Sequence, residues 1–179
     1  SDVYGNTVPG DDTSNVDLSI LTGTGAAGAS LLGTPSGTAD SGLVRLTRFS
    51  IDSAGTGYQL LASASGLASD TSQAFDGSAG AVAMVDVEPP TATFNALTAT
   101  KALAAVPRDI FGNAATPAIT WELADSTVAS IDSAGLATAN ANGTTEVFAT
   151  ALGVTASATL IVDQVPAALE FSVQPTNVM

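Results

Sequence analysis

The sequence contains neither cysteine nor histidine. Without cysteine there can be no disulfide, and zinc sites built from thiolate or imidazole ligands are excluded as well. Catalysis by a serine or cysteine nucleophile with a histidine base is excluded for the same reason. Any catalysis would therefore have to rest on carboxylates.

Basic residues and long hydrophobic runs are also scarce. Four Lys and Arg face 17 Asp and Glu, and the net charge is -13. Four cations cannot supply the phosphate neutralisation that nucleic-acid binding needs, nor a polybasic membrane tether. The longest apolar run, residues 81–85, is stopped by Asp86 and falls far short of the ~20 residues of a membrane span. Nucleic-acid binding and membrane insertion are thus excluded by composition.

Hydrophobic residues make up 45% of the chain, but they are spread over short segments that alternate with polar residues. This period of two is typical of strands with one buried face. It occurs in residues 16–20, 44–51, 58–64, 119–123 and 154–162. Gly, Pro, Asn and Asp bound each run, as turns require. The sequence therefore predicts an all-β protein built from antiparallel sandwiches.

Two linker-like stretches divide the chain. Residues 76–80 read Asp-Gly-Ser-Ala-Gly, and residues 163–166 read Asp-Gln-Val-Pro. We interpret residues 1–77 as a first domain, 81–163 as a second and 164–179 as a further strand. Because the sequence opens on Ser1 and closes on Met179, we expect it to be a segment of a longer protein.

Two short patterns recur in both predicted domains. Asp-Val-Tyr-Gly-Asn at 2–6 resembles Asp-Ile-Phe-Gly-Asn at 109–113, and Ser-Ile-Asp-Ser-Ala-Gly occurs identically at 50–55 and 130–135. In both patterns Asp or Asn can hydrogen-bond the turn backbone, and glycine can adopt a positive φ. The patterns indicate turns in which Gly5, Gly55, Gly112 and Gly135 can take a positive φ.

Residues 119–139 contain a tryptophan strand, then Asp-Ser-Thr-Val-Ala, then the hairpin sequence Ile-Asp-Ser-Ala-Gly-Leu-Ala-Thr-Ala. Residues 142–150 continue with Asn-Gly-Thr and a Val-Phe-Ala-Thr strand. This order resembles the bacterial Ig-like repeats of the intimin/invasin and group 2 type, over about residues 82–162. The resemblance implies an Ig-like sandwich and a non-enzymatic role in extracellular stalks, adhesins or surface layers.

The first domain is similar to another tandem repeat of bacterial surface proteins. In that family the repeat opens with a strand like residues 169–178, which here lie at the opposite end of the chain. The resemblance implies that the first domain lacks its first strand. The tail places Leu169, Phe171 and Val173 on one face, which makes it a donor-type strand. It could begin the next repeat of a longer chain, or it could pair with another copy, giving a homo-oligomer or a filament.

The sequence thus predicts a non-enzymatic structural protein of a bacterial or archaeal cell surface. An alternative is a carbohydrate- or receptor-binding adhesin module, which would need exposed aromatic residues. The single tryptophan, Trp121, lies on the face of Ile119 and Leu123, so we expect it in the core. Phe148 lies opposite Val147 and Ala149, and we predict that it is exposed as a possible interface.

The remaining candidate sites carry less information. Gly23, Gly25 and Gly28 form G-x-G-x-x-G, but the dinucleotide fingerprint requires a helix next, and further glycines and Pro35 follow instead. No cofactor is therefore expected. Calcium remains possible at pairs of oxygen ligands. The candidate pairs are Asp2 with Asn6, Asp109 with Asn113, and Asp86 with Glu88.

Overall fold

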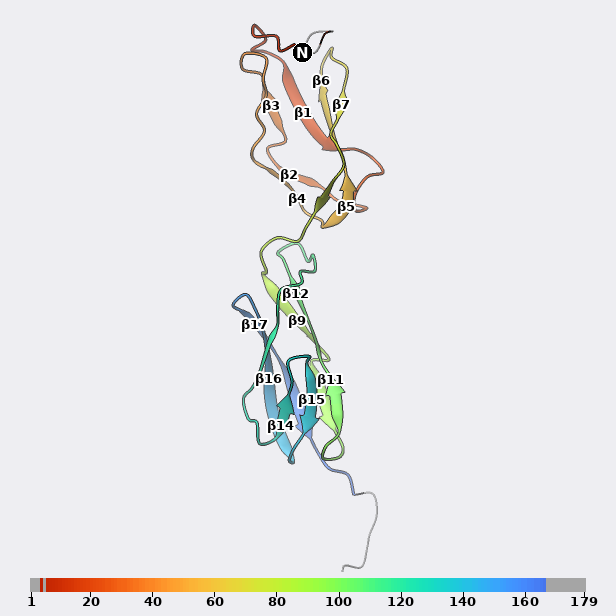
Figure 1. Ribbon diagram of the computed structural model, residues 1–179, viewed down its shortest axis with the longest axis vertical. Coiled ribbons are helices and arrows are strands. Elements are labelled where there is room, and N and C mark those ends of the chain that lie inside the picture. The colour runs from red at the N-terminus through yellow and green to blue at the C-terminus, as the bar shows by residue number, and fades with distance from the viewer. Residues whose placement is uncertain (1–3, 5, 167–179) are drawn as a thin grey trace, which may run out of the picture. The chain divides into compact units, whose positions relative to one another are not determined.

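The structure is a computed structural model that describes residue 4 and residues 6–166. Every regular element in these residues is a strand, which confirms the all-β prediction (Figure 1). The described residues contain no helical segment with the length and hydropathy that a membrane crossing requires. The chain forms two compact units. Unit 1 comprises the residues up to 81 together with 108–115, and unit 2 comprises residues 82–107 and the chain from 116 onward.

Unit 1 is built around a four-stranded sheet in the order β3-β1-β6-β7, and two further strand pairs, β2-β4 and β5-β8, complete it. Every one of these pairings is antiparallel. The strands are β1 (Asn15–Ile20), β2 (Leu31–Gly33), β3 (Ser36–Thr38), β4 (Phe49–Ile51), β5 (Gly55–Tyr58), β6 (Leu60–Ala64), β7 (Asp70–Thr71) and β8 (Phe75–Gly77).

One predicted strand of unit 1 is shorter than its sequence pattern suggests. Residues 44–51 alternate, yet only 49–51 form a strand. Residues 44–47 alternate between half-buried and exposed, but within the described chain no backbone hydrogen bond joins them to another segment. A Cβ at Gly37 would lie 2.9 Å from Cδ2 of Leu46 and 3.2 Å from Cγ1 of Val44. Because Gly37 leaves room for these side chains, the segment packs over β3 rather than pairing with its edge.

Unit 2 has a four-stranded sheet in the order β10-β17-β16-β13, a three-stranded sheet β11-β15-β14 and the pair β12-β9. β10 and β17 are parallel, whereas the pairings β11–β15, β13–β16, β14–β15 and β16–β17 are antiparallel. The strands are β9 (Met84–Glu88), β10 (Thr91–Phe94), β11 (Thr100–Ala102), β12 (Ala104–Arg108), β13 (Thr120–Leu123), β14 (Ala129–Ile131), β15 (Leu136–Ala139), β16 (Gly143–Ala151) and β17 (Val154–Val162).

The hydrophobic core lies almost entirely in unit 2. Its buried cluster draws on both large sheets and on β9, with Phe94 and Leu160 as its largest fully buried side chains. Many of the other members are alanine and valine, so the two layers approach closely. In the described part of unit 1 only two hydrophobic residues, Ala39 and Tyr58, are buried. The two units therefore differ sharply in how completely they bury their apolar faces.

Candidate functional site

An apolar face of unit 1 is formed by alternate residues of β1 and β6. The register pairs Val16 with Ala64, Leu18 with Ala62 and Ile20 with Leu60, so all six side chains lie on one side of the sheet. All six are only half-buried. A hollow of about 260 Å³ opens on this face, lined by Leu18, Leu60, Ala62, Asp70, Thr71 and Ser72. We call these six apolar residues the β1/β6 face.

Unit 2 has the same kind of face, and there it is closed. Alternate residues of β16 and β17, among them Val147, Ala149 and Leu160, have no exposed surface. β9 lies against both strands and contributes Val85 and Val87, each 8% exposed, to the same cluster. Complete burial in unit 2 thus depends on packed neighbours, namely β9 and the sheet β11-β15-β14.

The one large, fully buried side chain in the described part of unit 1 is Tyr58. Its hydroxyl donates to the carbonyl oxygen of Ser53 at 2.8 Å, and its ring stacks on Phe75 with centroids 6.0 Å apart. A Cβ at Gly25 would lie 2.0 Å from the Tyr58 ring, so only glycine fits there. Tyr58 therefore forms a small local core where β5, β8 and the β1–β2 loop meet.

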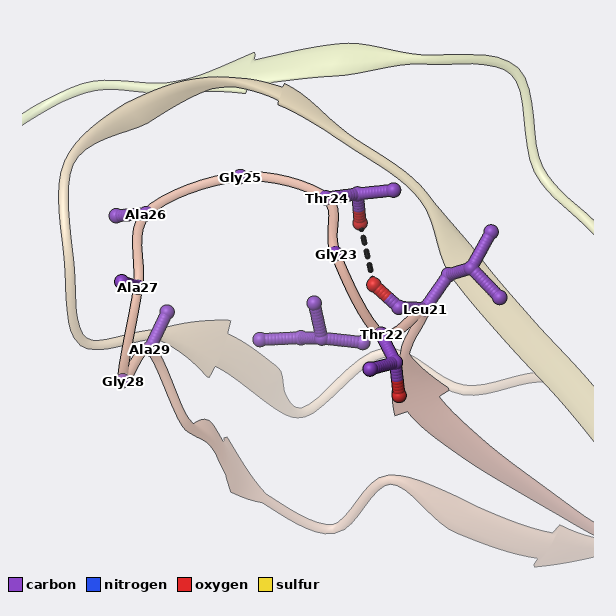
Figure 2. Close-up of a pocket in the computed structure, with 10 residues that line it drawn as sticks. Leu21, Thr22, Gly23, Thr24, Gly25, Ala26, Ala27, Gly28 and Ala29 are labelled. Carbon is purple, nitrogen blue, oxygen red and sulfur yellow. Dashed lines mark hydrogen bonds between the residues drawn. The ribbon is translucent and has the colours of Figure 1, made fainter.

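The glycine-rich loop that covers Tyr58 contains the G-x-G-x-x-G pattern. Figure 2 shows it as an open arch over residues 21–29, held at its start by a hydrogen bond from Thr24 Oγ1 to the carbonyl oxygen of Leu21, 2.7 Å long. It leads into strand β2, which confirms that no helix follows. The loop lines a hollow of about 480 Å³ with backbone, hydroxyl and apolar groups. It offers an anion neither a helix N-terminus nor a cation.

The pentapeptide 109–113 forms a compact polar turn in unit 1. Both carboxylate oxygens of Asp109 accept hydrogen bonds, from the backbone N–H of Gly80, Phe111 and Asn113 at 2.9 Å each and from Asn113 Nδ2 at 2.8 Å. Gly112 has φ +86°, as predicted. The Asn113 side chain, followed by the Gly80 N–H, lowers the pKa of Asp109 to about 2 from 3.8. Asp109 is thus a structural carboxylate that holds the turn together.

Asn113 links this turn to the loop between β4 and β5. Its Oδ1 accepts the N–H of Ala54 at 2.9 Å, and its Nδ2 donates to the carbonyl oxygen of Asp52 at 2.8 Å. The side-chain amide of Asn113 therefore satisfies the N–H of Ala54 and the carbonyl oxygen of Asp52, which lie two residues apart. The sequence analysis predicted turns at both places but not their contact. The repeated Asp-x-x-Gly-Asn pattern indicates a turn, but it carries no information about which distant segment Asn113 contacts.

The identical hexapeptides have different structures. In residues 130–135 the strands β14 and β15 pair with each other, Gly135 has φ +83° as predicted, and Asp132 Oδ1 accepts the N–H of Ala134 and of Leu136 at 2.9 Å. In residues 50–55 the flanking strands pair elsewhere, β4 with β2 and β5 with β8. Gly55 does not use its freedom to take a positive φ, because the loop connects two strand pairs, and Gly57 takes φ +72° instead.

Phe148 lies in the middle of β16, where it is paired across the sheet with Glu122 and Ser157. This places it on the side opposite Val147 and Ala149, as the sequence predicts. It is half-buried rather than exposed. Its role as an interface stays a prediction.

Leu169, Phe171 and Val173 lie outside the described residues. Trp121 is partly buried and packs against the core of unit 2. Within the described chain no three carboxylates gather as a metal site would need. Asp86 and Glu88 occupy the exposed side of β9, and calcium binding stays a prediction.

The second unit carries a recognisable family pattern. Residues 81–162 match the bacterial Ig-like domain (group 2). The match confirms the resemblance found in residues 82–162, and no curated protein sequence matches the chain.

Solved structures with a similar fold include surface layer protein SbsC, domains 1–6, at 13% identity and TM-score 0.46, over 96% of this chain and 22% of that one. A C-terminal fragment of intimin in complex with the intimin-binding domain of its translocated receptor is 16% identical, with TM-score 0.37, over 84% of this chain and 52% of the fragment. The chain therefore spans less than a quarter of the first of these proteins and about half of the second.

Proposed function

We propose that the chain is a segment of a non-enzymatic structural protein of a bacterial or archaeal cell surface. Its Ig-like units act as spacers in a stalk, adhesin or filament, and units join by addition of a β-strand. The partners are other copies of the chain or neighbouring repeats. The family of residues 81–162 supports the Ig-like spacer role.

The observation that carries strand addition is the half-covered β1/β6 face of unit 1. Its six apolar side chains are half-buried, whereas the apolar side of β16 and β17 in unit 2 is covered by β9 and by the sheet β11-β15-β14. Unsatisfied sheet faces and edges are association sites. Covering three large side chains such as Leu169, Phe171 and Val173 would contribute about 1.5–3 kcal/mol each. Burial of these side chains would therefore favour association of two units.

Particle size tests this proposal. Sedimentation and light scattering would compare the full chain with a chain that ends at Pro166. We expect the full chain to form oligomers that grow with concentration and the shortened chain to remain monomeric. Equal sizes for the two would refute assembly through the tail.

A matched pair of tail variants tests which side of the predicted strand is needed for assembly. The triple variant Leu169→Ser, Phe171→Ser, Val173→Ser removes the apolar face and should behave like the shortened chain. The control Glu170→Ser, Ser172→Ala, Gln174→Ser changes the alternate positions of the same strand and should assemble normally.

A further inference from the structure

We propose that the β1/β6 face of unit 1 is the acceptor for residues 169–175 of a second copy, which cover it as β9 covers unit 2. This inference rests on the proposed function and specifies which side of the donor segment lies on which surface of the acceptor. We infer the acceptor surface from the strand pairing and partial burial of its side chains. We infer the donor segment from the alternation of apolar and polar residues in its sequence.

The donor segment matches β9 residue by residue in its pattern. Residues 85–89 read Val-Asp-Val-Glu-Pro, and residues 171–175 read Phe-Ser-Val-Gln-Pro. In β9 the two valines are buried against β16 and β17, while Asp86 and Glu88 are exposed. Phe171 and Val173 hold the corresponding alternate positions. Residues 169–175 therefore have the side-chain pattern that closes a face of this type.

Among the described residues of unit 1, no strand covers the β1/β6 face as β9 covers β16 and β17 in unit 2. The hollow of about 260 Å³ over Leu18, Leu60 and Ala62 opens on the β1/β6 face. A large apolar side chain such as Phe171 suits this hollow.

The reach of the tail points to a second copy as the donor. The parallel pairing of β10 with β17 sets the end of β17 beside the end of β10, at Phe94 and Val162. β9 and β10 together run over residues 84–94, about 35 Å at 3.3 Å per residue. The stretch from Val162 to Leu169 spans at most about 25 Å. Both lengths are those of an extended chain, and the shorter reach of the tail favours a second copy as the donor.

Disulfide trapping tests the acceptor directly, because the chain has no cysteine of its own. Ala62 lies on the β1/β6 face, and its neighbour Ser63 is exposed on the other side of β6. In the donor segment, Phe171 belongs to the apolar side of the predicted strand and Ser172 to the polar side. Four mixtures follow, each combining Ala62→Cys or Ser63→Cys in one chain with Phe171→Cys or Ser172→Cys in another.

Mild oxidation should cross-link Ala62→Cys to Phe171→Cys about tenfold faster than the other three mixtures, because successive strand residues point to opposite faces and a disulfide needs close Cβ atoms. Leu18→Cys in place of Ala62→Cys provides a second acceptor position. Equal rates in all four mixtures would overturn the inference, provided that circular dichroism shows each variant folded.

Two further outcomes distinguish a wrong acceptor surface from a failure of the proposed strand addition. If the full chain assembles through its tail but Ala62→Cys and Leu18→Cys both fail to cross-link, the acceptor is wrong and strand addition stands. If the chain neither assembles nor cross-links, both fail. A doubly substituted Ala62→Cys, Phe171→Cys chain that closes on itself at high dilution faster than it dimerises would overturn the second copy as donor.

Discussion

Unit 1 and unit 2 use the same alternating sequence pattern and reach different degrees of burial. In β1 and β6 the apolar residues are half-buried, whereas in β16 and β17 residues such as Val147 and Leu160 have no exposed surface. The difference lies in the second layer, since β9 is present in one unit and has no described counterpart in the other. Alternation thus tells which side of a strand is apolar, and only a packed neighbour makes that side a core.

The two copies of Ser-Ile-Asp-Ser-Ala-Gly repeat this lesson on a smaller scale. In unit 2 the Asp132 carboxylate closes a hairpin by accepting two N–H groups of its own loop. In unit 1 Asp52 instead accepts the N–H of Ser30 at 2.8 Å, and Asn113 satisfies Ala54. Six identical residues therefore form a hairpin or a connection between strand pairs, according to the partners available.

The largest effect is expected at Tyr58, which holds the small core of unit 1. Tyr58→Ala should destabilise unit 1 by about 3–5 kcal/mol, the usual cost of removing a buried aromatic ring. The fluorescence of Trp121, which reports unit 2, should keep its unfolding midpoint. Hydrogen exchange would follow unit 1. The control Tyr4→Ala removes a ring that is 87% exposed and should change little; a similar loss from both variants would contradict the local core.

A matched pair of leucines measures the difference between the two faces. Leu160→Ala, at a fully buried position of unit 2, should cost about 2–5 kcal/mol. Leu60→Ala, at a half-buried position of unit 1, should cost less than about 1.5 kcal/mol because less apolar area is lost. Chemical unfolding of chains that end at Pro166 would provide both values. Equal losses would mean that the β1/β6 face is already covered.

The two hexapeptides can be separated by one substitution in each. Gly135→Ala places a side chain at φ +83° and within 2.5 Å of the Leu103 carbonyl oxygen, so we expect a loss of at least about 1–2 kcal/mol. Gly55 has no positive φ, and a Cβ there would lie 3.1 Å from that of Ala26. Gly55→Ala should therefore be the milder change in thermal unfolding. The reverse order would contradict the different turn structures.

The smallest effect near neutral pH concerns Asp109, because its contribution is lost only in acid. The folded pKa is about 2, below the ordinary 3.8, so the carboxylate stabilises unit 1 above pH 3.8. This contribution should disappear as the pH falls from about 4 to 2. Unfolding of Asp109→Asn between pH 5 and pH 2 should accordingly depend less on pH than unfolding of the original chain. Identical pH slopes would refute the assignment.

Much of the strand content could be predicted from alternation, because β1, β6, β13 and β17 each combine apolar residues on one side with polar residues on the other. The turn at Gly112 was equally predictable, since Asp and Asn bond the backbone around a glycine. Residues 44–47 and Gly55 could not be predicted, because their conformations depend on Gly37 and on strand pairing far along the chain.

The candidate site was predictable only in outline. The pattern of Leu169, Phe171 and Val173 indicates a strand with an apolar face, and the resemblance implied that the first domain lacks one. The contact of Asn113 with Asp52 and Ala54 joins residues about 60 positions apart, as no local pattern could indicate. Phe148 was placed on the correct side of its strand, but its degree of exposure depends on neighbouring strands.

The amino-acid order alone determined the all-β class, the side of each strand that is apolar, and the kind of chemistry available to a chain without histidine or cysteine. These follow from side-chain type and from the two-residue period of a strand, which are local properties. The tertiary structure decided which apolar sides became a core, what each copy of the hexapeptide bonds to, and that residues 108–115 belong to unit 1. Burial and long-range hydrogen bonds require a partner segment, and the presence of that segment is a property of the folded chain.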